Sequence, residues 1–112
     1  MTESIEENMN YFVLCENAKA YVRKTVSHGE LLAQLAEEST ELAHAALKMR
    51  RVITGDNPTP VSKGEALAAI KEEIADVELL IELLDVCDNG TVEAIKNRKI
   101  LRWQDRLEEA EK

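Results

Sequence analysis

Two pairs of acidic residues occur where a helical pattern would otherwise place apolar side chains. Glu38 and Glu41 lie in "LAEESTELAHA", and Glu73 and Asp76 lie in "IKEEIADVE". On a helix, a spacing of three residues aims both members of a pair in one direction. Carboxylate oxygens are the preferred ligands of hard cations such as Mg²⁺, Mn²⁺ and Ca²⁺. The two pairs are therefore candidate metal ligands.

The neighbours of these acids along the helix surface predict that the carboxylates flank a core. The line through Glu73 and Asp76 is otherwise apolar and holds Ala66, Ala69, Leu80, Leu83 and Cys87. The line through Glu38 and Glu41 is mixed and holds Leu31, Gln34, Ala45, Lys48 and Val52. If the two helices pack along these lines, the four carboxylates converge.

Such convergence needs a compensating charge. Two like charges about 4 Å apart repel by about 4 kcal/mol at an effective dielectric of ~20. Either some of the carboxylates are protonated or a cation lies among them. Each pair alone is also typical of a solvated helix edge, but the occurrence of both pairs on consecutive helices favours a metal site.

Helical periodicity covers most of the chain and predicts four helices. Apolar residues recur every three or four positions over about Ser4–Val26, about Glu30–Ile53, Ser62 or Gly64 to about Cys87, and Thr91 to the C-terminus. The main apolar stripes of the two middle helices include Leu32, Leu35, Leu42, Met49 and Ile53, and Leu67, Ile70, Ile74, Val77, Ile81 and Leu84. "SHG" and "TGDNPTP" interrupt the pattern, Thr91 is the expected N-cap of the last helix, and Trp103 is expected in the core. The class is all-α, a helical bundle with short connections.

Composition narrows the classes of partner. The 112 residues suggest one domain, and a net charge of −8 disfavours free nucleic acid or an anionic membrane as a partner. Cys15 and Cys87 are too few for a disulfide framework. "MTESIEENMN" does not resemble a signal peptide, and no apolar run reaches the ~18 residues of a membrane span. We therefore expect a cytoplasmic protein.

A di-iron centre is the rival metal interpretation. Glu41 and His44 form an ExxH motif like those of ferritin-like bundles. That centre needs a second ExxH, and the only other histidine, His28, lies outside such a motif. The sequence therefore favours hard cations over iron, and His44 is expected at or near the surface.

Basic residues gather in two places, at the end of the second predicted helix and along one side of the fourth. Lys48 begins "KMRR", where cations complement the helix dipole or contact a phosphate. On the last helix, Lys96, Lys99, Arg102 and Arg106 share one side. These side chains are equally suited to salt bridges with the acidic helices and to binding a polyphosphate.

Taken together, "EESTE" followed by "EEIAD" looks like the EExxE…EExxD signature of the MazG-like family of all-α nucleoside triphosphate pyrophosphohydrolases. "KNRKILRWQDRL" resembles the basic final helix of its short, often phage-related members. The superfamily also contains dimeric dUTPases, dCTP pyrophosphatases and phosphoribosyl-ATP pyrophosphohydrolase. The resemblance extends from about Gln34 to Arg106 and implies a four-helix MazG-like bundle completed by oligomerisation. Residues 1–29 would be an N-terminal helical extension and residues 30–112 the core.

The resemblance also implies an activity and a set of roles. The activity is Mg²⁺-dependent hydrolysis of an NTP or dNTP to the monophosphate and pyrophosphate, with Mn²⁺ as an alternative ion, in a homodimer or homotetramer. By motif position the metal ligands would be Glu38, Glu41, Glu73 and Asp76, with Glu37 and Glu72 in an outer-shell or base role. Phosphate would contact Lys99 and Arg102 first, then Lys96, Arg106 and Lys48. The alternative is a non-enzymatic acidic helical interaction module with a structural or regulatory metal site.

Overall fold

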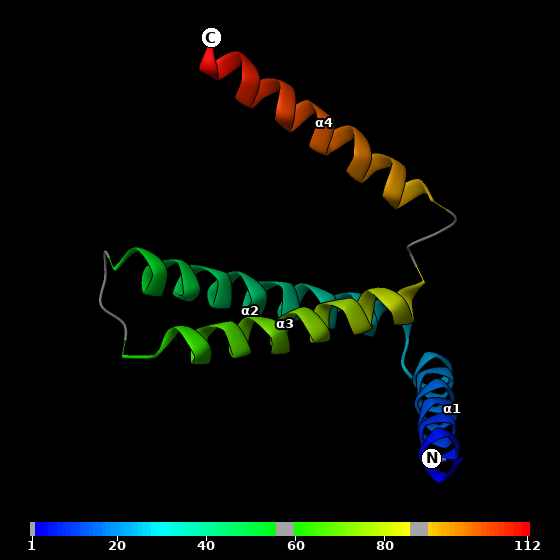
Figure 1. Ribbon diagram of the computed structural model, residues 1–112. Helices are drawn as coiled ribbons and strands as arrows, with labels where there is room; N and C mark the ends of the chain where they lie inside the picture. Colours follow the sequence, from blue (N-terminus) through cyan, green and yellow to red (C-terminus); the bar gives the residue numbers. More distant parts are fainter. Residues whose placement is uncertain (1, 56–59, 86–89) are drawn as a thin grey trace.

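The chain folds into four α-helices. The computed structural model describes residues 2–55, 60–85 and 90–112, and every regular element within these ranges is a helix (Figure 1). In order they are α1 (Thr2–Thr25), α2 (His28–Thr54), α3 (Lys63–Leu84) and α4 (Thr91–Glu111). The all-α class is thereby confirmed. Part of the "TGDNPTP" loop and Cys87 lie outside the described residues.

Serine caps fix the start of the two middle helices. The Ser27 hydroxyl accepts a hydrogen bond from the backbone N–H of Glu30 at 3.1 Å, and Ser62 accepts from Glu65 at 3.1 Å. Each cap satisfies one of the N–H groups that a helix start leaves without a partner. The interruption at "SHG" is consequently shorter than the sequence suggests, because α2 already begins at His28.

Left-handed residues mark three helix boundaries. Gly55, with φ 70°, closes α2, and its N–H donates to the Arg51 carbonyl at 2.8 Å. Asp85, with φ 52°, ends α3. At the start of α4, Gly90 with φ 91° holds the N-cap position and offers no side-chain cap. The prediction that Thr91 caps α4 is wrong, because this left-handed conformation suits glycine and strains a β-branched residue.

The core lies between α2 and α3, which run antiparallel and side by side (Figure 1). Leu31, Leu80, Leu83 and Leu84 form the buried cluster, and Val22, Val26 and Leu35 pack against it. The apolar lines beside the acids are thus buried in part, as predicted. The main stripes are less so, since Leu32 is 54% exposed and Ile53 59% exposed.

Two basic side chains attach α1 to the end of α3. The Lys19 ammonium lies 2.8 Å from a Glu82 carboxylate oxygen. Arg23 donates from Nε to the Leu83 carbonyl at 3.3 Å and from Nη2 to the Glu82 carbonyl at 3.1 Å. These carbonyls belong to the last turn of α3, where a cation is favoured by the helix dipole. The attachment involves only the C-terminal part of α1.

Helix α4 stands apart from the hairpin of α2 and α3 (Figure 1). Within the described residues it packs against none of the other three helices. Trp103, expected in the core, is 60% exposed, because none of the other helices described packs against α4. Of the helices described, none is long and apolar enough to cross a membrane.

Candidate metal centre

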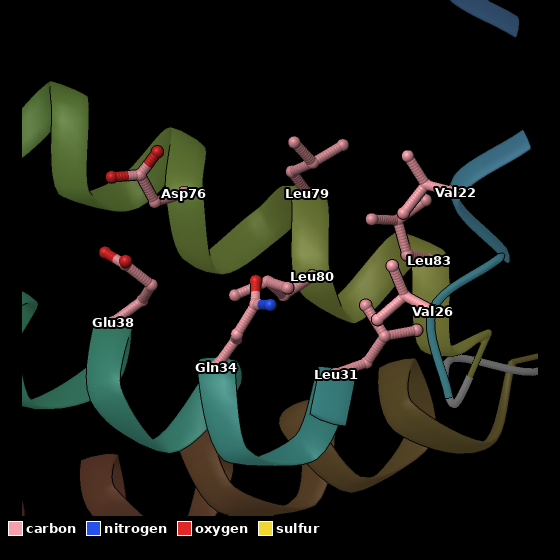
Figure 2. Close-up of a pocket in the computed structure, with 9 residues that line it drawn as sticks. All are labelled: Val22, Val26, Leu31, Gln34, Glu38, Asp76, Leu79, Leu80 and Leu83. Atoms are coloured by element: carbon pink, nitrogen blue, oxygen red, sulfur yellow. The ribbon is translucent and has the colours of Figure 1, made fainter. Parts of the chain in front are cut away.

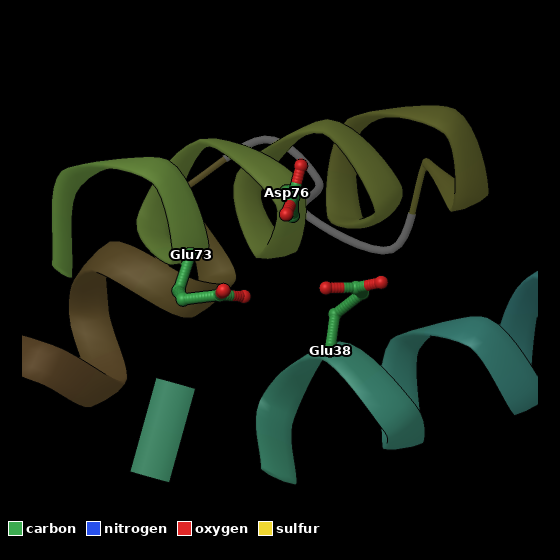
Figure 3. A group of neighbouring side chains, drawn as sticks. All are labelled: Glu38, Glu73 and Asp76. Atoms are coloured by element: carbon green, nitrogen blue, oxygen red, sulfur yellow. The ribbon is translucent and has the colours of Figure 1, made fainter. Parts of the chain in front are cut away.

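Three acidic side chains meet near the middle of the α2–α3 hairpin. Glu38 comes from α2, and Glu73 and Asp76 come from successive turns of α3 (Figure 3). Each offers one carboxylate oxygen, and these oxygens all lie within 4.8 Å of one another. The antiparallel pairing of the helices therefore brings together acids that are 35 residues or more apart in the sequence.

One of these oxygens is in an unfavourable state without a counter-charge. Oε2 of Glu73 is buried and has no hydrogen-bond partner among the described residues. No lysine or arginine of the described part of the chain forms an ion pair with Glu38, Glu73 or Asp76. A buried polar oxygen without a partner is costly, and a buried negative charge is more so. A cation bound by the three carboxylates would remove that cost.

The titration of Glu38 reflects the same crowding. Burial is the largest cause that raises the pKa of Glu38 above its ordinary value of 4.5, and the negative charges of Asp76 and Glu73 raise it further. Glu41 also contributes through its charge. Protons and a divalent ion would therefore compete for this group of oxygens.

The donor chemistry fits a hard divalent cation. All three ligand candidates are carboxylates, which suit Mg²⁺ or Mn²⁺, and Asp76 is exposed, so water molecules can complete the coordination. His44, the histidine of the ExxH motif, is exposed on α2 and does not belong to the group. This geometry does not support the di-iron interpretation.

The other predicted acids lie outside the group of three. Glu41, the fourth predicted ligand, has an exposed side chain one turn further along α2. Glu37 and Glu72 are exposed as well. They directly precede Glu38 and Glu73 in the sequence, so their Cα atoms border the group, but their side chains leave in other directions.

The predicted basic residues do not reach the acids within one chain. Lys99 and Arg102 line a hollow of about 400 Å³ on α4 together with Ile95 and Arg98. Arg98 was not among the predicted phosphate ligands, although its position beside Lys99 in the sequence is a visible signal. This hollow gathers positive charge on a helix that is separate from the acidic group.

The remaining basic candidates are scattered over the chain. Lys96 pairs with Glu93 of its own helix at 3.4 Å, and the alternative of salt bridges between α4 and the acidic helices is not realised among the described residues. Lys48 and Arg106 are exposed. Of the predicted set, Lys99 shares one hollow with Arg102 and another with Lys96.

A groove of about 260 Å³ runs from the acids towards α1 (Figure 2). Its lining residues are Val22, Val26, Leu31, Gln34, Glu38, Asp76, Leu79, Leu80 and Leu83. The line Leu31–Gln34–Glu38 along α2 was visible in the sequence, but the contribution of the N-terminal helix was not. The residues expected to form an extension thus supply one wall of the groove.

Comparisons with models of known protein families, with curated proteins and with solved structures gave no match. The assignment of function therefore depends on the motifs and on the geometry of the site.

Proposed function

We propose that this chain is a Mg²⁺-dependent nucleoside triphosphate pyrophosphohydrolase of the MazG-like type. The observation that carries the proposal is the group formed by Glu38, Glu73 and Asp76, in which one buried carboxylate oxygen has no partner among the described residues. These are three of the four acids at the ligand positions of the EExxE…EExxD motif. Motif and geometry thus select the same side chains.

The reaction adds water to the α-phosphorus of an NTP or dNTP and breaks the bond from that phosphorus to the α,β-bridging oxygen. The products are the nucleoside monophosphate and pyrophosphate. Bound Mg²⁺ supplies positive charge next to the phosphate oxygens and lowers the pKa of water. Glu38, Glu73 and Asp76 would hold it. Glu41, one turn along α2, is assigned as a further ligand that approaches when the site is loaded.

The remaining roles fall to residues that border the group. Glu37 and Glu72 are exposed next to the ligands, where a carboxylate can orient the attacking water and accept its proton. Lys99 and Arg102, with Arg98 beside them, neutralise the charge of the triphosphate. Because α4 does not pack against the acidic helices of its own chain, a second copy would have to bring this hollow to the acids.

The surface of the single chain supports an oligomer. Its accessible area is 9231 Å², whereas a folded monomer of 12.6 kDa exposes about 6,200 Å². Its radius of gyration is 19.1 Å, against about 13 Å for a compact chain of this length. Burial of this excess of about 3,000 Å² by each of two chains would cover about 6,000 Å² in total, as in the largest obligate interfaces. We infer a homodimer or homotetramer.

Pyrophosphate release from a panel of NTPs and dNTPs, with and without Mg²⁺, tests the proposal. Glu73→Gln should abolish release and the thermal stabilisation by Mg²⁺ while the helical circular dichroism persists. Glu78→Gln, the same change on the exposed side of α3, is the control and should leave both intact.

Two outcomes would contradict the proposed enzymatic activity. Release that persists undiminished in Glu73→Gln would show that the group of three does not act in hydrolysis. Stabilisation by Mg²⁺ without pyrophosphate release from any nucleotide would favour the interaction module with a structural metal site.

A further inference from the structure

We propose that the groove between α1, α2 and α3 is the nucleoside subsite, and that Gln34 reads the edge of the base. The inference rests on the proposed function and adds to it the place and the recognition chemistry of the uncharged half of the substrate. The proposed occupant is a single heterocyclic base with its sugar.

The groove is continuous with the acidic group. Glu38 and Asp76 belong both to the group of three carboxylates and to the lining of the groove (Figure 2). A ligand whose phosphates are held at these acids therefore has the groove as its neighbouring space. The α-phosphate, to which the nucleoside is attached, would lie at the junction.

The chemistry of the walls selects an uncharged, largely apolar group. From the acids the groove continues along aliphatic side chains, with Leu79, Leu80 and Leu83 on α3 facing Val22 and Val26 near the end of α1. Among its described lining residues there is no lysine or arginine. Apart from the neutral amide of Gln34, a phosphate would meet carboxylates and hydrocarbon there and no positive charge, so the groove disfavours the anionic end of the substrate.

Among the described lining residues Gln34 is the one neutral polar side chain, and it lies between the acids and the aliphatic part (Figure 2). Its amide makes no hydrogen bond among the described residues, so both its donor and its acceptor are available. A glutamine amide presents a donor and an acceptor side by side, which matches the paired groups along the edge of a base. Gln34 can therefore orient the ring that the leucines and valines contact.

The volume limits what can enter. Pockets for drug-sized ligands are about 300–1,000 Å³, and this groove holds about 260 Å³. A groove of this size suits a single small group such as a base with its sugar. A second copy of the chain could instead cover the same leucines. The solution mass of Leu79→Trp distinguishes this subunit contact from a bound nucleoside.

A matched pair of leucines provides the test. Leu79 and Leu67 are both on α3 and both 44% exposed, but only Leu79 lines the groove. Calorimetry with Mg²⁺ would measure binding of α,β-imido dNTP analogues carrying each of the four common bases, and of inorganic tripolyphosphate. Leu79→Trp should weaken the tightest analogue by about tenfold or more, which is about 1.4 kcal/mol. Tripolyphosphate should bind unchanged, and Leu67→Trp should alter neither ligand.

Gln34→Leu tests the reading of the base, with Gln104→Leu on the exposed surface of α4 as its control. Loss of a net hydrogen bond of about 0.5–1.5 kcal/mol predicts a roughly 2- to 12-fold weaker affinity for the preferred base and a changed ranking among bases. In the wild type, the Gln34 side-chain NH₂ signals should shift on addition of that analogue but not of tripolyphosphate.

The outcomes separate the two proposals. If the wild type releases pyrophosphate while Leu79→Trp and Gln34→Leu bind every analogue normally, the groove is not the nucleoside subsite although the activity stands. If Leu79→Trp but not Leu67→Trp changes the mass in solution, the groove is a subunit contact and the inference is overturned. If the wild type neither binds nor hydrolyses any nucleotide, both proposals fall.

Discussion

Replacement of Trp103 by alanine should shift the protein from oligomer towards monomer. The indole is 60% exposed on α4, and a tryptophan buries about 150–250 Å² in a core or interface. About 90–150 Å² is thus left for a partner to cover, which at ~25 cal/mol per Å² stabilises the assembly by about 2–4 kcal/mol per subunit. For a dimer with two such contacts, the substitution should raise the dissociation constant on the order of 10³-fold or more.

Tryptophan fluorescence can follow this experiment, because Trp103 is the one tryptophan of the sequence. Wild-type emission should shift to longer wavelength on dilution, as the indole passes from the interface into water. Light scattering should give at least twice the chain mass of 12.6 kDa for the wild type. Trp103→Ala should give a lower mass at the same concentration.

Gln104→Ala is the control on the same helix and should leave the mass unchanged. Helical circular dichroism should be equal in the two variants, since Trp103 packs against no other helix of its own chain. A wild type of 12.6 kDa with water-like emission at every concentration would show that the exposed side of α4 around Trp103 is not a subunit contact.

Three further predictions concern the single chain. Leu31→Ala should lower the free energy of unfolding by about 3–5 kcal/mol in urea titration, because Leu31 is 1% exposed at the centre of the small core; an effect below about 1 kcal/mol would contradict that role. Arg23→Met should lower it by about 1–2 kcal/mol through loss of the hydrogen bonds to the end of α3, and amides of that turn should exchange faster; unchanged exchange would show that the bonds do not hold α1 in place. In EDTA, stability should fall as the pH rises from 4.5 through the raised pKa of Glu38, because the folded state gives up a proton there that the unfolded chain has already lost. Glu38→Gln should flatten that slope in urea titrations at several pH values, and a slope that persists would assign it to another group.

The sequence predicted the elements of the fold well because helix periodicity and capping are local. Ser27 and Ser62 cap helices that the apolar pattern had already indicated. Gly90 was missed as the N-cap because a left-handed backbone conformation leaves no pattern of its own, while Thr91 offers the usual capping hydroxyl. The error was one residue at a boundary.

Packing between helices was less predictable. Acids at positions i and i+3 of one helix share a face, so the proximity of Glu73 and Asp76 could be predicted from the sequence. The proximity of Glu38 to them could be predicted once α2 and α3 were expected to pack together. The exposure of Trp103 could not be predicted from the sequence. The apolar pattern on α4 is the same whether a helix of the same chain or of a partner covers it. For the same reason the wall that α1 gives to the groove was not visible.

The attachment of α1 through Lys19 and Arg23 leaves a long arm towards the N-terminus and a short one towards the groove, on either side of a pivot at Arg23. Ile5 lies about 27 Å from the pivot at a rise of ~1.5 Å per residue, whereas Val26 lies within about 5 Å on the other side. A rotation that moves Ile5 by about 5 Å therefore displaces Val26 by about 1 Å. A contact that tilts the exposed far end of α1 would therefore also move Val26 at the groove, which would couple that contact to the width of the proposed nucleoside subsite.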